Sequence, residues 1–171
     1  MCIRDRIIIC TNFYSKATKS FYDTLTSTQY EIRTMISGIH HINFLVRDLD
    51  KAIHHYESIL GLPTFKKDQL RQRGVKTARV KLGETWLILV QPLDSDGVPG
   101  KHLEKFGEGF FLLSLETDNL EQSIKDITEN NGELSGPIRS GLDDWQVQDL
   151  NPKQFFGTQI QIVEDRGKST E

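Results

Sequence analysis

Apolar and polar positions change their spacing several times between residues 39 and 91, and each change predicts a new element. The β-branched and aromatic run at residues 39–46 predicts a strand. Asp48 or Asp50 can then cap a helix, and Gly61 is suited to its C-terminal end. The apolar positions of this helix recur at helical spacing: Ile53, Tyr56, Ile59 and Leu60.

Three short strands are predicted after this helix, at residues 63–67, 75–82 and 85–91. Gly83 and Glu84 fit a tight hairpin turn between the last two strands. The order of elements in this half of the chain is therefore βαβββ.

The same order recurs in the second half of the chain. Residues 110–116 predict a strand, Asn119 can cap a helix with Gln122 as the reciprocal partner, and Gly132 can end that helix. Its apolar face is formed by Leu120, Ile124 and Ile127. Three more strands are predicted, at residues 133–138, 145–150 and 158–164. Two tandem βαβββ modules, about residues 36–92 and 109–165, predict an α+β fold.

The remaining segments lie outside these modules. Residues 93–108 predict a loop with one short helical turn at 102–106. Residues 1–34 lack a sustained period and are predicted to be an extension outside a domain at residues 35–171. Their first six residues resemble a translated sequencing adapter, so the extension is either a gene-calling artefact or a genuine tail.

Composition narrows the possible functions. The chain has 171 residues, of which 37% are hydrophobic and 26% charged, with a formal net charge of -3 and no long apolar run. Without a long apolar run we expect no membrane span. Without a basic stripe we expect no nucleic-acid partner. Cys2 and Cys10 have neither metal-ligand spacing nor a disulfide pattern, and a cytoplasmic location is expected.

The paired modules resemble the vicinal oxygen chelate superfamily, which includes glyoxalases, bleomycin resistance proteins and dioxygenases. The resemblance covers residues 36–165 and is most specific at 39–53, 56–62 and 103–109. The last stretch is most similar to methylmalonyl-CoA epimerases. The resemblance implies a curved mixed sheet around a cup that holds a ligand, and a homodimer.

Metal-dependent members of this superfamily place four ligands in the cup, on the first, fourth, fifth and eighth strands. Carried over by position, these places are occupied here by His41, Ile88, Leu112 and Gln161. Isoleucine and leucine supply no donor atom to a divalent ion. We therefore expect no metal and no other cofactor.

The resemblance also implies where catalytic carboxylates would lie in epimerases. Those places hold Gln161 and Thr77, which cannot act as general acids or bases at neutral pH. Epimerase chemistry is therefore disfavoured, and His41 is the one candidate catalytic residue that remains. A lone inward histidine is otherwise a hydrogen-bonded core residue.

Because side chains alternate along a strand, residues two apart from a ligand position share the inner face of the sheet. Besides His41, this predicts a ligand-binding set of nine residues: Asn43, Thr77, Arg79, Trp86, Ile88, Leu112, Ser114, Gln159 and Gln161. Trp86 is suited to stack on a planar ligand and Arg79 to bind an anion. Trp145 either gates a ligand or covers the core.

Three functions remain open. The first, which we favour, is binding of a small organic molecule in the cup without a metal. The second is a lyase, isomerase or dioxygenase that uses His41, either with a metal bound through unexpected ligands or without one. The third is a dimerisation module whose cup is filled by its own side chains.

Overall fold

A computed structural model describes residues 35–167 of the chain. The prediction for residues 1–34 lies outside this range. The first module comprises β1 (Gly38–Leu45), α2 (Leu49–Leu60), β2 (Lys66–Leu70), the 3-10 helix η1 (Arg71–Arg73), β3 (Val75–Leu82) and β4 (Thr85–Pro92). The second comprises β5 (Gly109–Glu116), α4 (Leu120–Glu129), β6 (Leu134–Ser140), β7 (Trp145–Leu150), the 3-10 helix η2 (Pro152–Phe155) and β8 (Gln159–Asp165), and α3 (Val98–Phe106) connects the modules.

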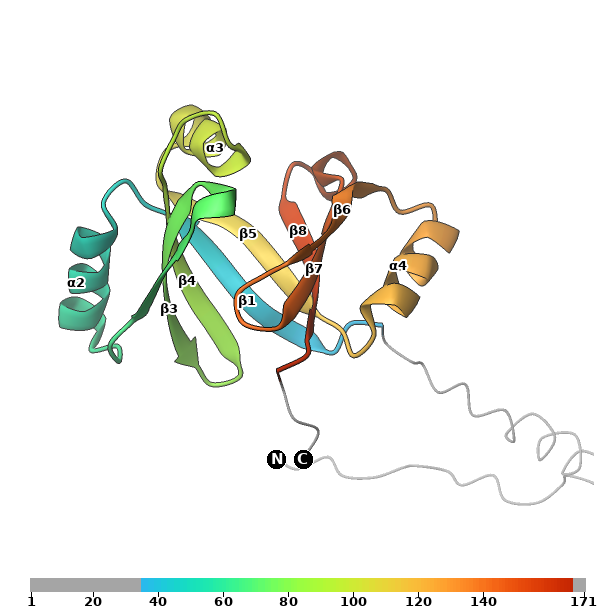
Figure 1. The fold of residues 1–171 in the computed structure, drawn as a ribbon, viewed down its shortest axis with the longest axis horizontal. Helices are drawn as coiled ribbons and strands as arrows, with labels where there is room; N and C mark the ends of the chain where they lie inside the picture. Colours follow the sequence, from blue (N-terminus) through green and yellow to red (C-terminus); the bar gives the residue numbers. More distant parts are fainter. Residues whose placement is uncertain (1–34, 168–171) are drawn as a thin grey trace, which may run out of the picture. The chain divides into compact units, whose positions relative to one another are not determined.

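The eight strands form one mixed sheet in the order β2-β3-β4-β1-β5-β8-β7-β6. β1 is parallel to β4 and β5 is parallel to β8, whereas β1 and β5 pair antiparallel at the centre and join the modules. Helices α2 and α4 lie on the outer sides of the two halves of the sheet (Figure 1). The predicted α+β fold of two βαβββ modules is confirmed.

The start of each module helix follows the sequence pattern. Asp48 Oδ1 accepts a hydrogen bond from the Lys51 amide at 3.0 Å, and Asn119 Oδ1 accepts one from the Gln122 amide at 2.9 Å. Gly61 ends α2 with a φ of 65°, in the left-handed region where glycine is favoured. Asp48 is therefore the cap of α2.

Five predicted details of the helices and strands are wrong. Ile59 and Leu60 are 74% and 62% exposed, because α2 buries only Leu49 and Ile53, in its first two turns. The side chain of Gln122 donates to Asp126, and α4 ends at Glu129, before Gly132. The other two details concern β2 and α3.

β2 begins three residues later than predicted. Phe65 is buried under α2, and its amide donates to Glu57 Oε1 rather than to a neighbouring strand. The pairing with β3 covers Lys66–Leu70, a mostly polar stretch whose residues carry no alternating signal. The bounds of such an edge strand depend on its hydrogen bonds to the neighbouring strand rather than on alternating apolar and polar residues in its own sequence.

α3 is longer than the single predicted turn, because Pro99 and Gly100 lie inside its first turn. Proline is favoured there, since the first amides of a helix have no partner within it. A Cβ on Gly100 would lie 2.2 Å from the Asp94 carbonyl oxygen, so only glycine allows this close approach. No helix among residues 35–167 is long and apolar enough to cross a membrane.

Buried apolar side chains form three clusters. One lies between α2 and the sheet, and another lies between α4 and the sheet. The third lies on the opposite, inner face, and it includes Ile88, Leu112, Leu142, Trp145 and Val147. This inner cluster forms much of the wall of the cup.

Candidate functional site

The inner face of the sheet encloses a cavity of about 360 Å³. Such a volume is within the range of small-molecule sites. Seven residues predicted to face the cup line this cavity: His41, Asn43, Thr77, Ile88, Leu112, Gln159 and Gln161. They come from β1, β3, β4, β5 and β8, so the two modules build the cavity together.

One end of the cup is filled by three side chains. The Arg79 guanidinium lies 5.3 Å from the ring centroid of Trp86 and 5.5 Å from that of Trp145. Arg79 is 1% exposed and forms ion pairs with Asp143 at 2.9 Å and Asp68 at 3.6 Å. We call Arg79, Trp86 and Trp145 the plug, because they close this end of the cup.

The plug changes where two predicted site residues lie. Arg79 and Trp86 are outside the lining of the cavity, and Trp145 lines it where Trp86 was expected. The charge of Arg79 is already paired with carboxylates, so it does not meet a ligand in this cavity. Ser114 also lies outside the lining, because it is fully buried beneath Gln161 and bonded to it at 3.3 Å.

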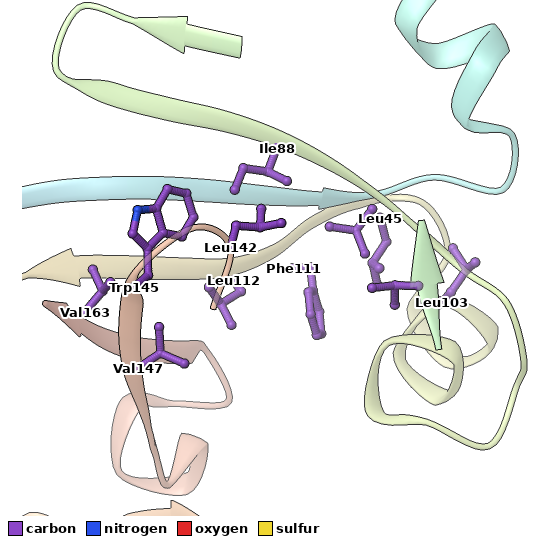
Figure 2. Close-up of a cluster of buried hydrophobic side chains, with 11 residues drawn as sticks. Leu45, Ile88, Leu103, Phe111, Leu112, Leu142, Trp145, Val147 and Val163 are labelled. Carbon is purple, nitrogen blue, oxygen red and sulfur yellow. The ribbon is translucent and has the colours of Figure 1, made fainter. Parts of the chain in front are cut away.

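Ile88 and Leu112, the apolar residues at two of the four metal-ligand positions, form part of the cavity wall. Ile88 is 3% exposed and Leu112 is 8% exposed. Figure 2 shows their side chains grouped with Leu142, Trp145 and Val147 in the inner cluster. This part of the cavity offers van der Waals contact and no donor atom for a metal.

Gln161 is held at both ends of its amide. Its Oε1 accepts from Ser114 Oγ at 3.3 Å, and its Nε2 donates to Asp149 Oδ1 at 2.8 Å. Among the residues that the structure describes, no group of three His, Cys, Asp or Glu side chains could hold a metal ion. The residues present therefore do not fit the metal site that the superfamily implies.

His41 lies at the end of a short chain of polar contacts. Its Nδ1 is 2.8 Å from Nδ1 of His40, and Nε2 of His40 is 3.4 Å from Asp165 Oδ2. The pKa of His41 is held well below its ordinary value of 6.5, chiefly by burial and further by His40 and Arg73. His41 is therefore neutral at neutral pH.

The protonation state of His40 decides which nitrogen of His41 carries its proton. A neutral His40 that donates from Nε2 to Asp165 has an unprotonated Nδ1, which accepts a hydrogen bond. His41 then donates from Nδ1 to His40, so its own Nε2 carries a lone pair. A lone pair on a cavity-lining histidine can accept a proton or a hydrogen bond from a ligand.

Among residues 35–167, two polar atoms in the cavity lining have no hydrogen-bond partner. Thr77 Oγ1 and Asn43 Oδ1 are both buried and unpaired. An unsatisfied buried polar atom costs roughly 1–3 kcal/mol, so such atoms are rare in native proteins. A bound ligand or an ordered water in the cavity would supply the missing partners.

Three charged residues of the cavity were not predicted from the sequence. Arg139 on β6 forms an ion pair with Asp149 on β7, and Arg73 of η1 donates from Nη2 to the Ser140 carbonyl oxygen. All three line the cavity. Asp149 could have been found, because Trp145, Val147 and Asp149 alternate along β7, but the arginines come from polar segments without such a pattern.

Three other histidines do not line the cavity. His54 and His55 are exposed on α2, whereas His102 packs on Phe106 and Phe111. Asp94 Oδ1 accepts from the amides of Asp96 and Gly97, as a polar turn does.

Comparisons of sequence give a family. The profile of the Glyoxalase/Bleomycin resistance protein/Dioxygenase superfamily matches residues 40–148. Mitochondrial methylmalonyl-CoA epimerase of Homo sapiens is 29% identical over 129 residues, which cover 74% of this chain and 73% of the human protein. The Mus musculus enzyme is also 29% identical over 129 residues, with 74% of this chain and 72% of the mouse protein covered.

Solved structures give the same fold. Methylmalonyl-CoA epimerase from Mycobacterium tuberculosis has a TM-score of 0.73 at 24% identity, covering 81% of this chain and 94% of that protein. A methylmalonyl-CoA epimerase in complex with methylmalonyl-CoA and ammonium has a TM-score of 0.74 at 24% identity, covering 80% and 99%. At this identity the likeness concerns the fold.

Proposed function

Because the chain belongs to the Glyoxalase/Bleomycin resistance protein/Dioxygenase superfamily, we propose that it uses the cup of that fold to bind a small organic molecule without a metal. One observation carries the proposal. The cavity combines unpaired polar atoms of Thr77 and Asn43 with apolar Ile88 and Leu112 at two metal-ligand positions. Such a lining suits an organic ligand with one or two polar groups.

An acyl thioester is the first ligand class to test. The relatives are named as methylmalonyl-CoA epimerases, and one was solved with methylmalonyl-CoA. The residues of the cup do not support the epimerase reaction in this chain. Thr77 and Gln161 occupy the positions at which the family resemblance places carboxylates, and neither side chain titrates near neutral pH.

A thermal-shift screen in the presence of a chelator tests the proposal. Propionyl-CoA, methylmalonyl-CoA and a panel of carboxylic acids, ketones and aromatic compounds are the probes. We expect at least one probe to raise the melting temperature in a concentration-dependent way, because a ligand that binds only the folded state stabilises it. A panel that gives no shift with the chelator, but shifts after zinc or cobalt is added, would contradict metal-free binding.

Thr77 provides the matched variant for that screen. Thr77→Val keeps the shape of the side chain and removes an unpaired hydroxyl, so the fold should keep its stability while the ligand binds about tenfold more weakly. Thr85→Val is the control, since the Thr85 hydroxyl bonds to the Ile39 carbonyl oxygen and lies outside the cavity. Equal weakening by both variants would assign the effect to the sheet rather than to the cavity.

A second candidate function is metal-free proton transfer by His41. The contacts from Asp165 through His40 to His41 favour it, because with a neutral His40 they leave Nε2 of His41 with a lone pair in the cavity lining. The substrate would have an acidic C–H bond next to a carbonyl or thioester group.

Deuterium exchange tests this second function. Propionyl-CoA is incubated with the protein in D2O, and loss of the proton next to the thioester carbonyl is followed by NMR. The hypothesis predicts exchange above the buffer rate that His41→Gln abolishes. Exchange at the buffer rate, or exchange unchanged in that variant, would leave His41 as a hydrogen-bonded core residue.

A further inference from the structure

The charges that line the cavity do not cancel. Arg73, Arg139 and Asp149 are the charged residues of the lining, and His41 is neutral because its pKa is low. Arg139 and Asp149 form an ion pair with each other. One positive charge, that of Arg73, is therefore left without a counter-charge in the lining.

The surroundings of Arg73 confirm that its charge is unmatched. Within residues 35–167, no carboxylate lies within ion-pair distance of its guanidinium, which donates a hydrogen bond to the neutral carbonyl oxygen of Ser140. Arg73 is part-buried, and its pKa is lowered chiefly by this burial and next by nearby Arg139, while Asp149 acts in the opposite direction with a smaller effect. A cation in this position gains from an added anion, because partial burial weakens the solvation that would otherwise compensate it.

A second positive feature at the cavity is already matched. The N-terminus of α3 contributes Gly97, Val98 and Pro99 to the lining, and a helix N-terminus carries partial positive charge. Asp94 Oδ1 accepts hydrogen bonds from the amides of Asp96 and Gly97 there. The carboxylate of Asp94 therefore matches the helix N-terminus, whereas Arg73 has no matching carboxylate in the lining.

We infer that Arg73 binds the carboxylate of a monoanionic ligand whose apolar body lies against Ile88, Leu112 and Val147. This inference rests on the proposed function and, within it, favours simple carboxylic acids over CoA thioesters, because the phosphate groups of CoA bring several negative charges. A carboxylate brings one negative charge and matches the planar guanidinium with two parallel hydrogen bonds. A phosphate monoester brings nearly two negative charges, which would exceed the single uncompensated positive charge of the lining.

Matched acids and amides test the inference. Binding of hexanoate and hexanamide, and of 3-phenylpropionate and 3-phenylpropionamide, is measured by ligand-observed NMR with a chelator present. The members of each pair have similar size and differ in charge. We expect each acid to bind at least about tenfold more tightly than its amide, and Arg73→Gln to remove that difference.

Two further variants separate charge from fold. Arg71→Gln is the control, because Arg71 is exposed on the same 3-10 helix and does not line the cavity, so it should keep the preference for the acid. Asp149→Asn raises the formal charge of the lining from +1 to +2, so it should tighten binding of the acids and not of the amides. Damage to the fold would weaken binding of both members of a pair.

The outcomes that overturn the inference differ from those that overturn the proposed function. Equal affinity for acid and amide, or a preference that survives Arg73→Gln, rejects the role of Arg73 while the cavity still binds an organic ligand. Stronger competition by inorganic phosphate than by hexanoate at equal concentration would reject the carboxylate as the anion. A protein that binds neither member of either pair contradicts the proposed function, and the inference fails with it.

Discussion

The ring of His41 stacks on the indole of Trp145, with 5.2 Å between the ring centroids and 18° between the planes. The same indole also contacts the guanidinium of Arg79. Trp145 is therefore the member of the plug that faces the open cavity, and it lies between His41 and the other two members, Arg79 and Trp86. The position of the plug decides which tryptophan can touch a ligand.

Replacing each tryptophan should separate the two roles. Trp145 is 3% exposed and lines the cavity, so Trp145→Ala should lower the free energy of unfolding by about 3–5 kcal/mol and also weaken ligand binding. Trp86 is only part-buried and lies outside the lining, so Trp86→Ala should cost less stability and leave ligand affinity unchanged. Urea unfolding and ligand titration measure the two effects.

Trp145→Phe keeps an aromatic ring and should fold, so it provides the control if Trp145→Ala does not. Loss of ligand affinity in Trp86→Ala at normal stability would show that Trp86 reaches the ligand. The location of the plug would then be wrong.

Stability should depend on pH through His41. Its pKa in the folded state is well below its value when unfolded, which is about 6.5. The unfolded chain therefore binds a proton first as the pH falls, and the contribution of neutral His41 to stability, complete above about pH 6.5, is lost below it. The free energy of unfolding should fall by roughly 1.4 kcal/mol per pH unit below 6.5 because of this residue.

Comparison of the wild type with His41→Gln isolates this effect. Urea unfolding at several values between pH 7.5 and 5 is the measurement, and the variant should have a shallower slope below pH 6.5. Parallel slopes for the two proteins would mean that His41 titrates as an exposed histidine does.

The purified protein should carry no stoichiometric divalent metal. Ile88 and Leu112 supply no donor atoms, and the amide of Gln161 is bonded to Ser114 and Asp149. Elemental analysis after dialysis against a modest chelator is the measurement. A variant that combines Ile88→Gln, Leu112→His and Gln161→Glu should bind zinc or cobalt, because it restores oxygen and nitrogen donors.

Metal binding by this triple variant would show that elemental analysis detects a metal site in this fold. About one equivalent of metal in the wild type, lost in His41→Ala, would contradict the absence of a metal site and favour the metalloenzyme alternative.

Removing residues 1–34 should leave a folded domain. Every strand and helix of the two modules lies within Gly38–Asp165. Circular dichroism and urea unfolding of the full chain and of residues 35–171 should agree to within about 0.5 kcal/mol. A loss of several kcal/mol on truncation would place the first 34 residues in the packing of the domain.

The sequence was sufficient to predict the residues whose orientation depends on strand periodicity alone. Thr77, Ile88, Leu112 and Gln161 line the cavity because alternate side chains of a strand share a face, whatever lies opposite. The fold followed from the repeated order of elements. Each of these predictions needed only local pattern and the repeat.

Predictions that depended on packing between modules were less successful. Trp86 has the predicted orientation, but Trp145 from the second module lies 6.3 Å from it and takes its place in the lining. Arg73 reaches the cavity by bonding to Ser140, a residue far along the chain in a polar strand. No local spacing encodes such contacts, because they depend on how the two halves of the sheet curve toward each other.

The most direct test of metal-free binding in the cup is methyl NMR of isoleucine-labelled protein in excess chelator. The probe is the compound that raises the melting temperature most in the screen described above. The account predicts that the Ile88 methyl resonances shift on titration, while those of Ile124, which lies on α4 and packs against the cluster between that helix and the sheet, do not. Unchanged Ile88 resonances at saturating compound, or shifts that appear only after a divalent metal is added, would contradict it.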